Sequence, residues 1–283
     1  MDTDRGPLRR LAEVRGWVGG FDTPHQHVTL VAADGTEIGA SYLAGPTADA
    51  PAVVVCHGFA AHREKPAYAR LADRLRRGVH VLTLDHRGHG TSNGVSTLGV
   101  DEWQDVAAAV GWFSDRGQRT IVPVGVSMGG AAVLQALAAG VEVSAAVLVS
   151  TGAYRGRVRR PGLADLDEVV RHPVKRTLWQ WLVGFRFVHP SELDAAPDPI
   201  AHAVDVRVPA LIVHGEDDDY FPPSDADQLA DAIPAPTTVW HEPPGFGHAE
   251  TGITHAFADR LADAIVTQAR TGRFPPHDGA SGS

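Results

Sequence analysis

The chain has 283 residues, of which 43% are hydrophobic and 21% are charged, so it is long and apolar enough to bury a sizeable core. Its formal net charge of -9 argues against a nucleic-acid partner, because phosphate binding needs a basic surface, and against an anionic membrane surface. The single cysteine, Cys56, excludes an intramolecular disulfide.

The N-terminal residues 1–20 carry charges throughout and lack the apolar run of a secretory signal. No stretch approaches the ~20 consecutive apolar residues of a membrane-spanning helix. The sequence therefore predicts a cytoplasmic protein.

The first predicted elements are two alternating runs, His27–Ala32 and Glu37–Leu43, which are separated by Asp34-Gly35 and predict an antiparallel hairpin. Later runs are short and almost wholly apolar, as in strands buried on both faces of a parallel sheet. They are Ala52–Cys56, Val79–Leu84, Ile121–Val126, Val143–Val149, Ala210–Val213 and Thr237–Trp240.

Helical patterns occupy the intervals between these strands. Apolar residues recur at helical spacing over Tyr68–Leu75, Val106–Phe113 and Phe257–Ile265, and Met128–Ala139 is rich in good helix formers. The alternation predicts an α/β fold, with a mainly parallel doubly wound sheet, an antiparallel N-terminal hairpin and helices on both faces.

Residues 151 to about 208 interrupt this alternation and predict a short cap inserted into one domain that spans residues 1–271. They include a cluster of arginines, a group of acids and a stretch of aromatic residues, namely Arg155, Arg157, Arg159 and Arg160; Asp165, Asp167 and Glu168; and Trp179, Trp181, Phe185 and Phe187. The arginines suit either an anionic ligand or, more simply, a solvated face balanced by the acids. The Pro/Gly/Ser-rich residues 272–283 predict a disordered tail.

The strongest chemical signal is Gly125-Val126-Ser127-Met128-Gly129, which lies between an apolar strand and a predicted helix. This strand–turn–helix context is what a nucleophile elbow requires, because the tight turn leaves room only for small residues around the serine. A phosphate loop would require a lysine that is absent here. We therefore predict Ser127 as a nucleophile.

A serine hydroxyl needs a base, usually a histidine that a carboxylate holds in one tautomer. Among fifteen histidines, His248 is the best candidate, because its Pro- and Gly-rich loop follows the last predicted strand. The carboxylate is expected in the run Glu216-Asp217-Asp218-Asp219, at the end of another strand. From these residues alone the choice among the four acids stays open, and a solvated turn or a weak calcium loop is an alternative.

These residues resemble the α/β-hydrolase fold superfamily over about residues 27–270. His57-Gly58-Phe59 resembles its oxyanion loop, and Asp85-His86-Arg87-Gly88-His89-Gly90 resembles the turn after its next strand. In that family the acid commonly lies three residues after the glycine of a His-Gly pair and four before a proline, and only Asp218 fits both counts. The resemblance also implies an oxyanion hole formed by the backbone N–H groups of Phe59 and Met128.

The resemblance implies a serine hydrolase that cleaves carboxylic esters of small or medium size through an acyl-enzyme, with Trp179, Trp181 and Tyr220 as candidate substrate contacts. Thioesters, lactones, amides and C–C bonds are alternative substrates for the same triad. A non-catalytic binding protein of this fold is the alternative from another class. The expected partner is a small-molecule ester, and the sequence does not indicate an oligomeric state.

No cofactor or metal is expected. His86 and His89 are three residues apart, as metal ligands can be, but further ligands do not cluster near them in the sequence, and we interpret this turn as structural. Epoxide hydrolases and haloalkane dehalogenases share the fold but carry an aspartate at the elbow, so Ser127 argues against both.

Overall fold

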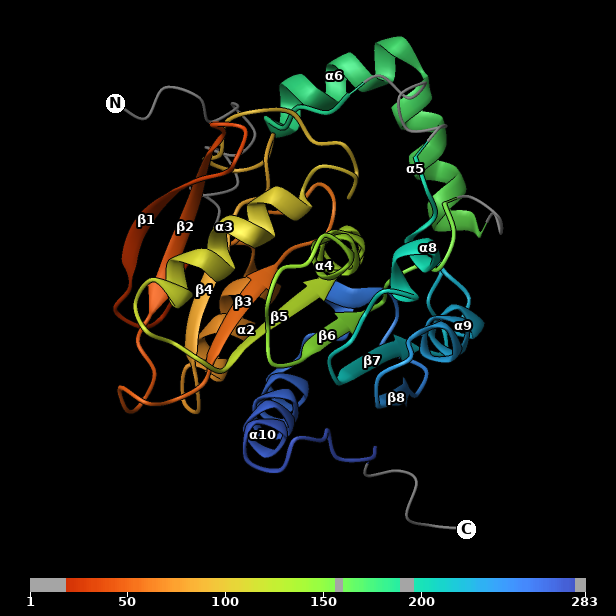
Figure 1. The fold of residues 1–283 in the computed structure, drawn as a ribbon. Helices are drawn as coiled ribbons and strands as arrows, with labels where there is room; N and C mark the ends of the chain where they lie inside the picture. Colours follow the sequence, from red (N-terminus) through yellow and green to blue (C-terminus); the bar gives the residue numbers. More distant parts are fainter. Residues whose placement is uncertain (1–18, 156–159, 189–195, 278–283) are drawn as a thin grey trace.

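The structure is a computed structural model that describes residues 19–155, 160–188 and 196–277. Eight strands form one sheet in the order β1-β2-β4-β3-β5-β6-β7-β8 (Figure 1). They are β1 (Gln26–Val31), β2 (Glu37–Leu43), β3 (Ala52–Cys56), β4 (His80–Leu84), β5 (Ile121–Val126), β6 (Ala146–Val149), β7 (Ala210–Gly215) and β8 (Thr237–Glu242). The pairs β1–β2 and β2–β4 are antiparallel and all others are parallel, so the predicted sheet is confirmed.

Helices cover both faces of this sheet. They are α2 (Pro66–Leu75), α3 (Trp103–Ser114), α4 (Met128–Ala138), α8 (Pro199–Ala203), α9 (Ser224–Ala232) and α10 (His255–Thr271). The alternation of side chains along β3 shows how the sheet joins two cores: Val53 and Val55 pack toward α2 and α10, whereas Val54 packs toward α3 and α4. This two-sided burial explains why the parallel strands are apolar at nearly every position.

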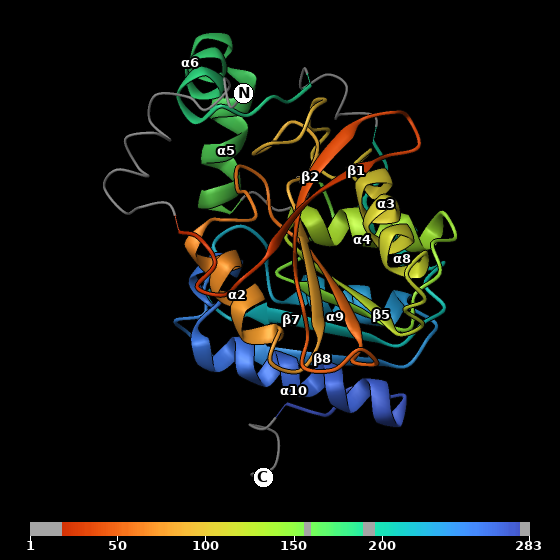
Figure 2. The same ribbon diagram turned by 90° about the vertical axis from the view of Figure 1, so that its left-hand side faces the viewer.

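The segment between β6 and β7 adds two further helices, α5 (Pro161–Arg171) and α6 (Pro173–Val183). Both views place them apart from the two helical layers, on the side of the sheet where α4 begins (Figures 1 and 2). A third apolar cluster joins them to the body, with Phe185 and Phe187 buried against Phe59 and Leu98. The cap limits proposed for this segment stay a prediction.

Several element bounds differ from those expected. The run at 143–145 precedes β6 instead of belonging to it, because the ladder to β7 begins only at Ala146. Helix α9 was not predicted, since only Ala226 and Leu229 among its apolar residues are fully buried. Of the predicted tail, residues 272–277 are described and Phe274 is buried, and residues 278–283 lie outside the described residues.

No helix in the described part of the chain is long and apolar enough to cross a membrane.

A buried ion pair fixes the turn after β4. Asp85 is fully buried and accepts hydrogen bonds from the backbone N–H groups of Arg63 and Thr91, at 2.8 Å each, and from the Arg63 guanidinium. Burial alone raises the pKa of Asp85, but the charge and N–H group of Arg63 outweigh it and hold that pKa below its usual value. Its stabilising effect is therefore present above the unfolded-state pKa and is lost as pH falls through the folded-state pKa.

Replacing Asp85 by alanine should lower the free energy of unfolding by about 3–5 kcal/mol, because the buried Arg63 guanidinium then loses its main ion pair and keeps the Glu64 carboxylate, at 3.5 Å, as its charged partner. Urea unfolding at neutral pH measures this loss. The control Asp34→Ala removes an exposed partner of Arg87 at 2.8 Å and should cost about 1 kcal/mol or less. Equal losses in the two variants would contradict this account.

Candidate active site

Ser127 lies in the turn between β5 and α4, in a strained backbone conformation with φ 52° and ψ -114°. Its N–H donates to the Val149 carbonyl at 2.8 Å, which ties the turn to β6. The turn leaves no space beside the serine: a Cβ on Gly125 would lie 2.5 Å from the Gly129 carbonyl oxygen, and one on Gly129 would lie 2.3 Å from the Cys56 carbonyl oxygen. Both glycines are therefore required.

Three of the predicted site residues meet at the carboxyl edge of the sheet. His248 Nε2 lies 3.0 Å from Ser127 Oγ, and His248 Nδ1 lies 2.8 Å from Asp218 Oδ2. They come from the turn after β5, the loop after β8 and the loop after β7. An ionised carboxylate only accepts hydrogen bonds, so Nδ1 carries the imidazole proton and Nε2 is free to accept the proton of the Ser127 hydroxyl.

The carboxylate of Asp218 is fully buried, and both of its oxygens are satisfied. Oδ1 accepts hydrogen bonds from the backbone N–H groups of Tyr220 and Phe221 at 2.8 and 3.0 Å. Burial raises the pKa of Asp218, but the hydrogen bond and charge of His248 together with the Phe221 N–H bring it below the usual value. Asp218 is thus ionised at neutral pH.

The neighbouring Asp217 has a different position. Its exposed carboxylate accepts hydrogen bonds from the backbone N–H groups of Gly245 and Gly247, at 2.6 and 2.8 Å, and these amides lower its pKa. Asp217 therefore holds the main chain of the loop that carries His248, while Asp218 holds the imidazole. Side-chain geometry separates two acids that look alike in the sequence.

The loop after β3 is fixed on both sides of Phe59. The Gly58 N–H donates to the Tyr68 hydroxyl at 2.8 Å, and the Ala60 N–H donates to His89 Nε2 at 3.2 Å. Within the described residues the Phe59 amide makes no hydrogen bond, and the Met128 amide, as the first in α4, has no partner in its own helix. Both residues line the same cavity as Ser127, which is where an oxyanion hole needs its donors.

The contacts of Tyr68 and His89 were not predicted from the sequence. Tyr68 looked like an ordinary core residue of a helix, and nothing in the spacing indicates that its hydroxyl reaches Gly58. Burial lowers the pKa of His89 to about 4, so its imidazole is neutral at pH 7, donates from Nδ1 to the Arg87 carbonyl and accepts at Nε2. The structure thus gives the turn at His86 and His89 a structural role.

A cavity of about 1230 Å³ opens above Ser127 and is walled partly by the segment between β6 and β7. Of the predicted substrate contacts, Trp179 and Tyr220 line this cavity. Trp181 is not among its lining residues, and its side chain is 62% exposed.

Two arginines of the segment between β6 and β7, Arg155 and Arg160, bind main-chain carbonyl groups. Arg155 donates to the carbonyl oxygens of Leu98, Gly99 and Pro197, at 2.7, 3.3 and 3.0 Å, and Arg160 donates to that of Asp218. These two arginines therefore do not form the solvated, acid-balanced face that we expected. The Asp167 and Glu168 carboxylates pair instead with Arg171 and Lys175. Arg157 and Arg159 lie outside the described residues.

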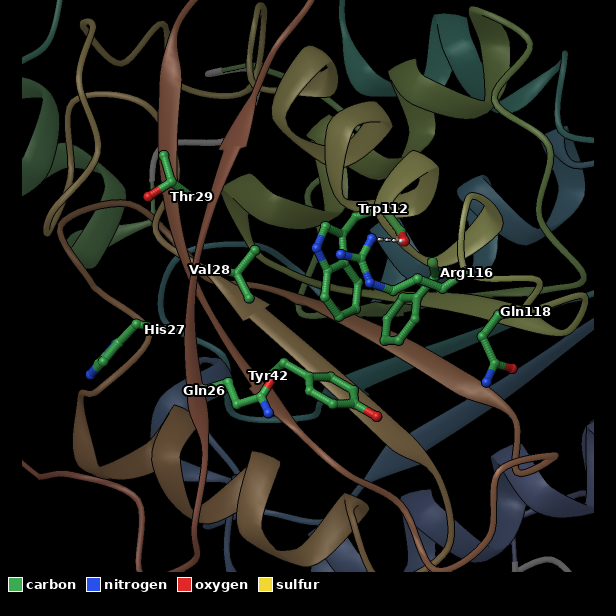
Figure 3. A pocket seen from close by; sticks show the side chains of 9 residues that line it. Gln26, His27, Val28, Thr29, Tyr42, Trp112, Arg116 and Gln118 are labelled. Carbon is green, nitrogen blue, oxygen red and sulfur yellow. Dashed lines mark hydrogen bonds between the residues drawn. The ribbon is translucent and has the colours of Figure 1, made fainter.

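A second, smaller hollow of about 540 Å³ lies between the β1–β2 hairpin and the end of α3. Figure 3 shows the Arg116 guanidinium beside the indole of Trp112, 3.8 Å from the ring centroid, with Tyr42 below them. None of the predicted site residues lines this hollow.

Known proteins resemble this chain in fold. A family model described as the alpha/beta hydrolase fold matches residues 51–182. A search of curated proteins finds no significant match. Among solved structures, an esterase from Pyrococcus furiosus is 20% identical, with a TM-score of 0.66, over 89% of this chain and 97% of that one.

Two further structures give the same result. A putative aryl esterase from Burkholderia cenocepacia is 20% identical, with a TM-score of 0.66, over 87% of this chain and 100% of that one. An esterase from Exiguobacterium antarcticum is 18% identical, with a TM-score of 0.63, over 85% and 99%. Because the family model and these structures agree with the sheet described above, we conclude that the chain has the α/β-hydrolase fold.

Proposed function

We propose that the protein is a serine hydrolase that cleaves carboxylic esters through an acyl-enzyme. One observation carries the proposal: the hydroxyl of Ser127, the imidazole of His248 and the carboxylate of Asp218 form a continuous hydrogen-bonded line, with contacts of 3.0 and 2.8 Å. This line opens into a cavity of about 1230 Å³, which has room for the acyl and alcohol parts of an ester. The esterase names of the three solved structures are in keeping with it.

The first half of the reaction transfers the acyl group to the protein. His248 Nε2 takes the hydroxyl proton as Ser127 Oγ attacks the carbonyl carbon, and Asp218 stabilises the resulting imidazolium. The backbone N–H groups of Phe59 and Met128 stabilise the negative charge on the tetrahedral oxygen. By comparison with a side-chain donor, each N–H group lowers the free energy of the transition state by about 3 kcal/mol. The C–O bond to the alcohol then breaks, and His248 returns its proton to the leaving oxygen.

The second half repeats these steps with water. His248 accepts a proton from a water molecule, whose oxygen attacks the acyl carbon, and the bond to Ser127 Oγ breaks as that oxygen regains a proton. The products are a carboxylic acid and an alcohol. Thioesters, lactones, amides and certain C–C bonds fit the same sequence of proton transfers, so a substrate panel is needed to rank them.

Ser127→Ala should lower the turnover of p-nitrophenyl esters by at least about 10⁴-fold, because it removes the attacking oxygen. It should also abolish labelling by a fluorophosphonate probe. The exposed serine at the end of α3 provides a control, and Ser114→Ala should be labelled like the wild type. A Ser127→Ala protein that cleaves esters at the wild-type rate would refute the mechanism. A wild type that binds esters without turnover or labelling would favour the non-catalytic alternative.

Asp218→Asn should lower kcat by about 10³- to 10⁴-fold, because an amide no longer favours the imidazole tautomer with its proton on Nδ1. Asp217→Asn should lower kcat less than about tenfold, since its contacts are with main-chain amides at the loop surface. Steady-state kinetics of the two variants on one ester test the assignment, and a greater loss in Asp217→Asn would reverse it.

A further inference from the structure

The imidazole of His248 is stacked on an aromatic ring of the acid loop, which is the loop after β7 that contains Asp218 (residues 216–223). The Tyr220 ring centroid lies 4.3 Å from that of His248, and the two planes are 25° apart. Tyr220 also donates its backbone N–H to Asp218 Oδ1 at 2.8 Å. The ring that contacts the base is therefore fixed to the carboxylate that orients the base.

The same ring is confined by the first turn of α5. Gly162 is the second residue of that helix, and a Cβ there would lie 2.7, 2.8 and 3.1 Å from three carbons of the Tyr220 ring. This is closer than side-chain carbons pack, so only glycine leaves room for the ring in its observed position. The Tyr220 ring is thus in contact with the backbone of α5 and with the imidazole of His248.

Main-chain hydrogen bonds hold this turn of α5 against the acid loop. The Gly162 N–H donates to the Asp219 carbonyl at 3.1 Å, and the Arg160 guanidinium donates to the Asp218 carbonyl. The start of α5 therefore contacts the two residues before Tyr220 as well as its ring. The first turn of α5 and the acid loop form one packed unit beside the imidazole.

The hydroxyl of Tyr220 has no part in these contacts. Within the described residues it makes no hydrogen bond, and burial together with the Asp219 and Asp165 charges raises its pKa, so the phenol is neutral at pH 7. What reaches His248 is the face of the ring. Phenylalanine offers the same face and leucine does not.

We propose that Tyr220 is a positioning residue: its ring, confined by Gly162, holds the imidazole of His248 in the orientation that reaches Ser127. The inserted segment thereby supports the reaction through Tyr220 in addition to walling the cavity. This inference rests on the proposed function, because it concerns the base of that reaction. An imidazole turned away from Ser127 cannot accept the hydroxyl proton, and only the aligned fraction of molecules reacts.

The positioning role and a substrate-binding role of Tyr220 predict different kinetics. Loss of a substrate contact raises KM, and the increase grows with the acyl chain that the contact serves. Loss of positioning lowers kcat by the same factor for p-nitrophenyl acetate, butyrate and hexanoate and leaves KM nearly unchanged. Tyr220→Leu should show the second pattern, with a loss of about fivefold to tenfold, which lies within the range of about twofold to thirteenfold expected for one aromatic contact. Tyr220→Phe should have the wild-type kcat, because phenylalanine keeps the ring face that contacts His248.

Gly162→Ala tests the confinement directly. A glycine-to-alanine change inside a helix normally stabilises it, so an unconfined site would give a protein at least as stable and as active as the wild type. We expect instead a fall in kcat similar to that of Tyr220→Leu. Gly111→Ala is the matched control, because a Cβ there meets nothing within 4 Å, and it should leave kcat unchanged. The double variant Tyr220→Leu/Gly162→Ala should be no slower than Tyr220→Leu alone.

Three results would overturn the inference: a wild-type kcat in Tyr220→Leu, a wild-type kcat in Gly162→Ala, or single losses that multiply in the double variant. A wild type that neither turns over esters nor reacts with a fluorophosphonate refutes the proposed function instead. The crystal structure of Gly162→Ala then decides the positioning role, which requires the Tyr220 ring and the His248 imidazole to be displaced together. An imidazole that stays 3.0 Å from Ser127 Oγ in that structure would refute it.

Discussion

The close approach of main chains around Ser127 is the constraint on which the rest of the site depends. The turn from β5 into α4 lies so near to β3 and to its own following residues that a Cβ on either flanking glycine would overlap a carbonyl oxygen. Within this space the serine takes a positive φ, which lifts its side chain out of the turn toward the cavity. The strain is sustained because the sheet on one side and α4 on the other leave no alternative path.

The parallel arrangement of β5, β7 and β8 brings the His248 imidazole and the Asp218 carboxylate to the same edge of the sheet as Ser127. Parallel strands end at a common edge, so loops that are distant in the sequence become neighbours there. This is why the acid loop and the histidine loop reach the serine although 121 residues separate Ser127 from His248. The register of β7 against β8 pairs Gly215 with Glu242 and thus starts the two loops side by side. The sheet thereby sets the distances that the chemistry needs.

Much of this arrangement was predictable because it follows from local patterns. Strands buried on both faces are apolar at almost every position, so they can be found in the sequence. A serine flanked by glycines directly after such a strand is typical of a nucleophile elbow. Helices α5 and α6 were harder to predict, because their apolar residues face a small separate cluster around Phe185 instead of the main cores. Long-range contacts could not be predicted. No pattern of residues in the sequence indicates that the Tyr68 hydroxyl accepts a hydrogen bond from Gly58, or that Gly162 packs against Tyr220. The acidic run is a further example. The family pattern predicted Asp218 as the partner of the histidine, but the sequence did not indicate that Asp217 binds the main chain of the loop that carries His248.

The neutral histidines that support the loop after β3 affect how the stability of the protein depends on pH. His57 accepts the His86 N–H through Nε2, and His89 accepts the Ala60 N–H in the same way, so each bond requires an unprotonated ring nitrogen. Burial lowers the pKa of His57 well below its usual value and that of His89 to about 4, whereas an unfolded chain protonates both near pH 6.5. Between these limits the unfolded state takes up protons that the folded state excludes, and the folding equilibrium shifts against the native protein as the medium is acidified. The tolerance of this hydrolase fold to low pH is thus set in part by two imidazoles that never meet the solvent.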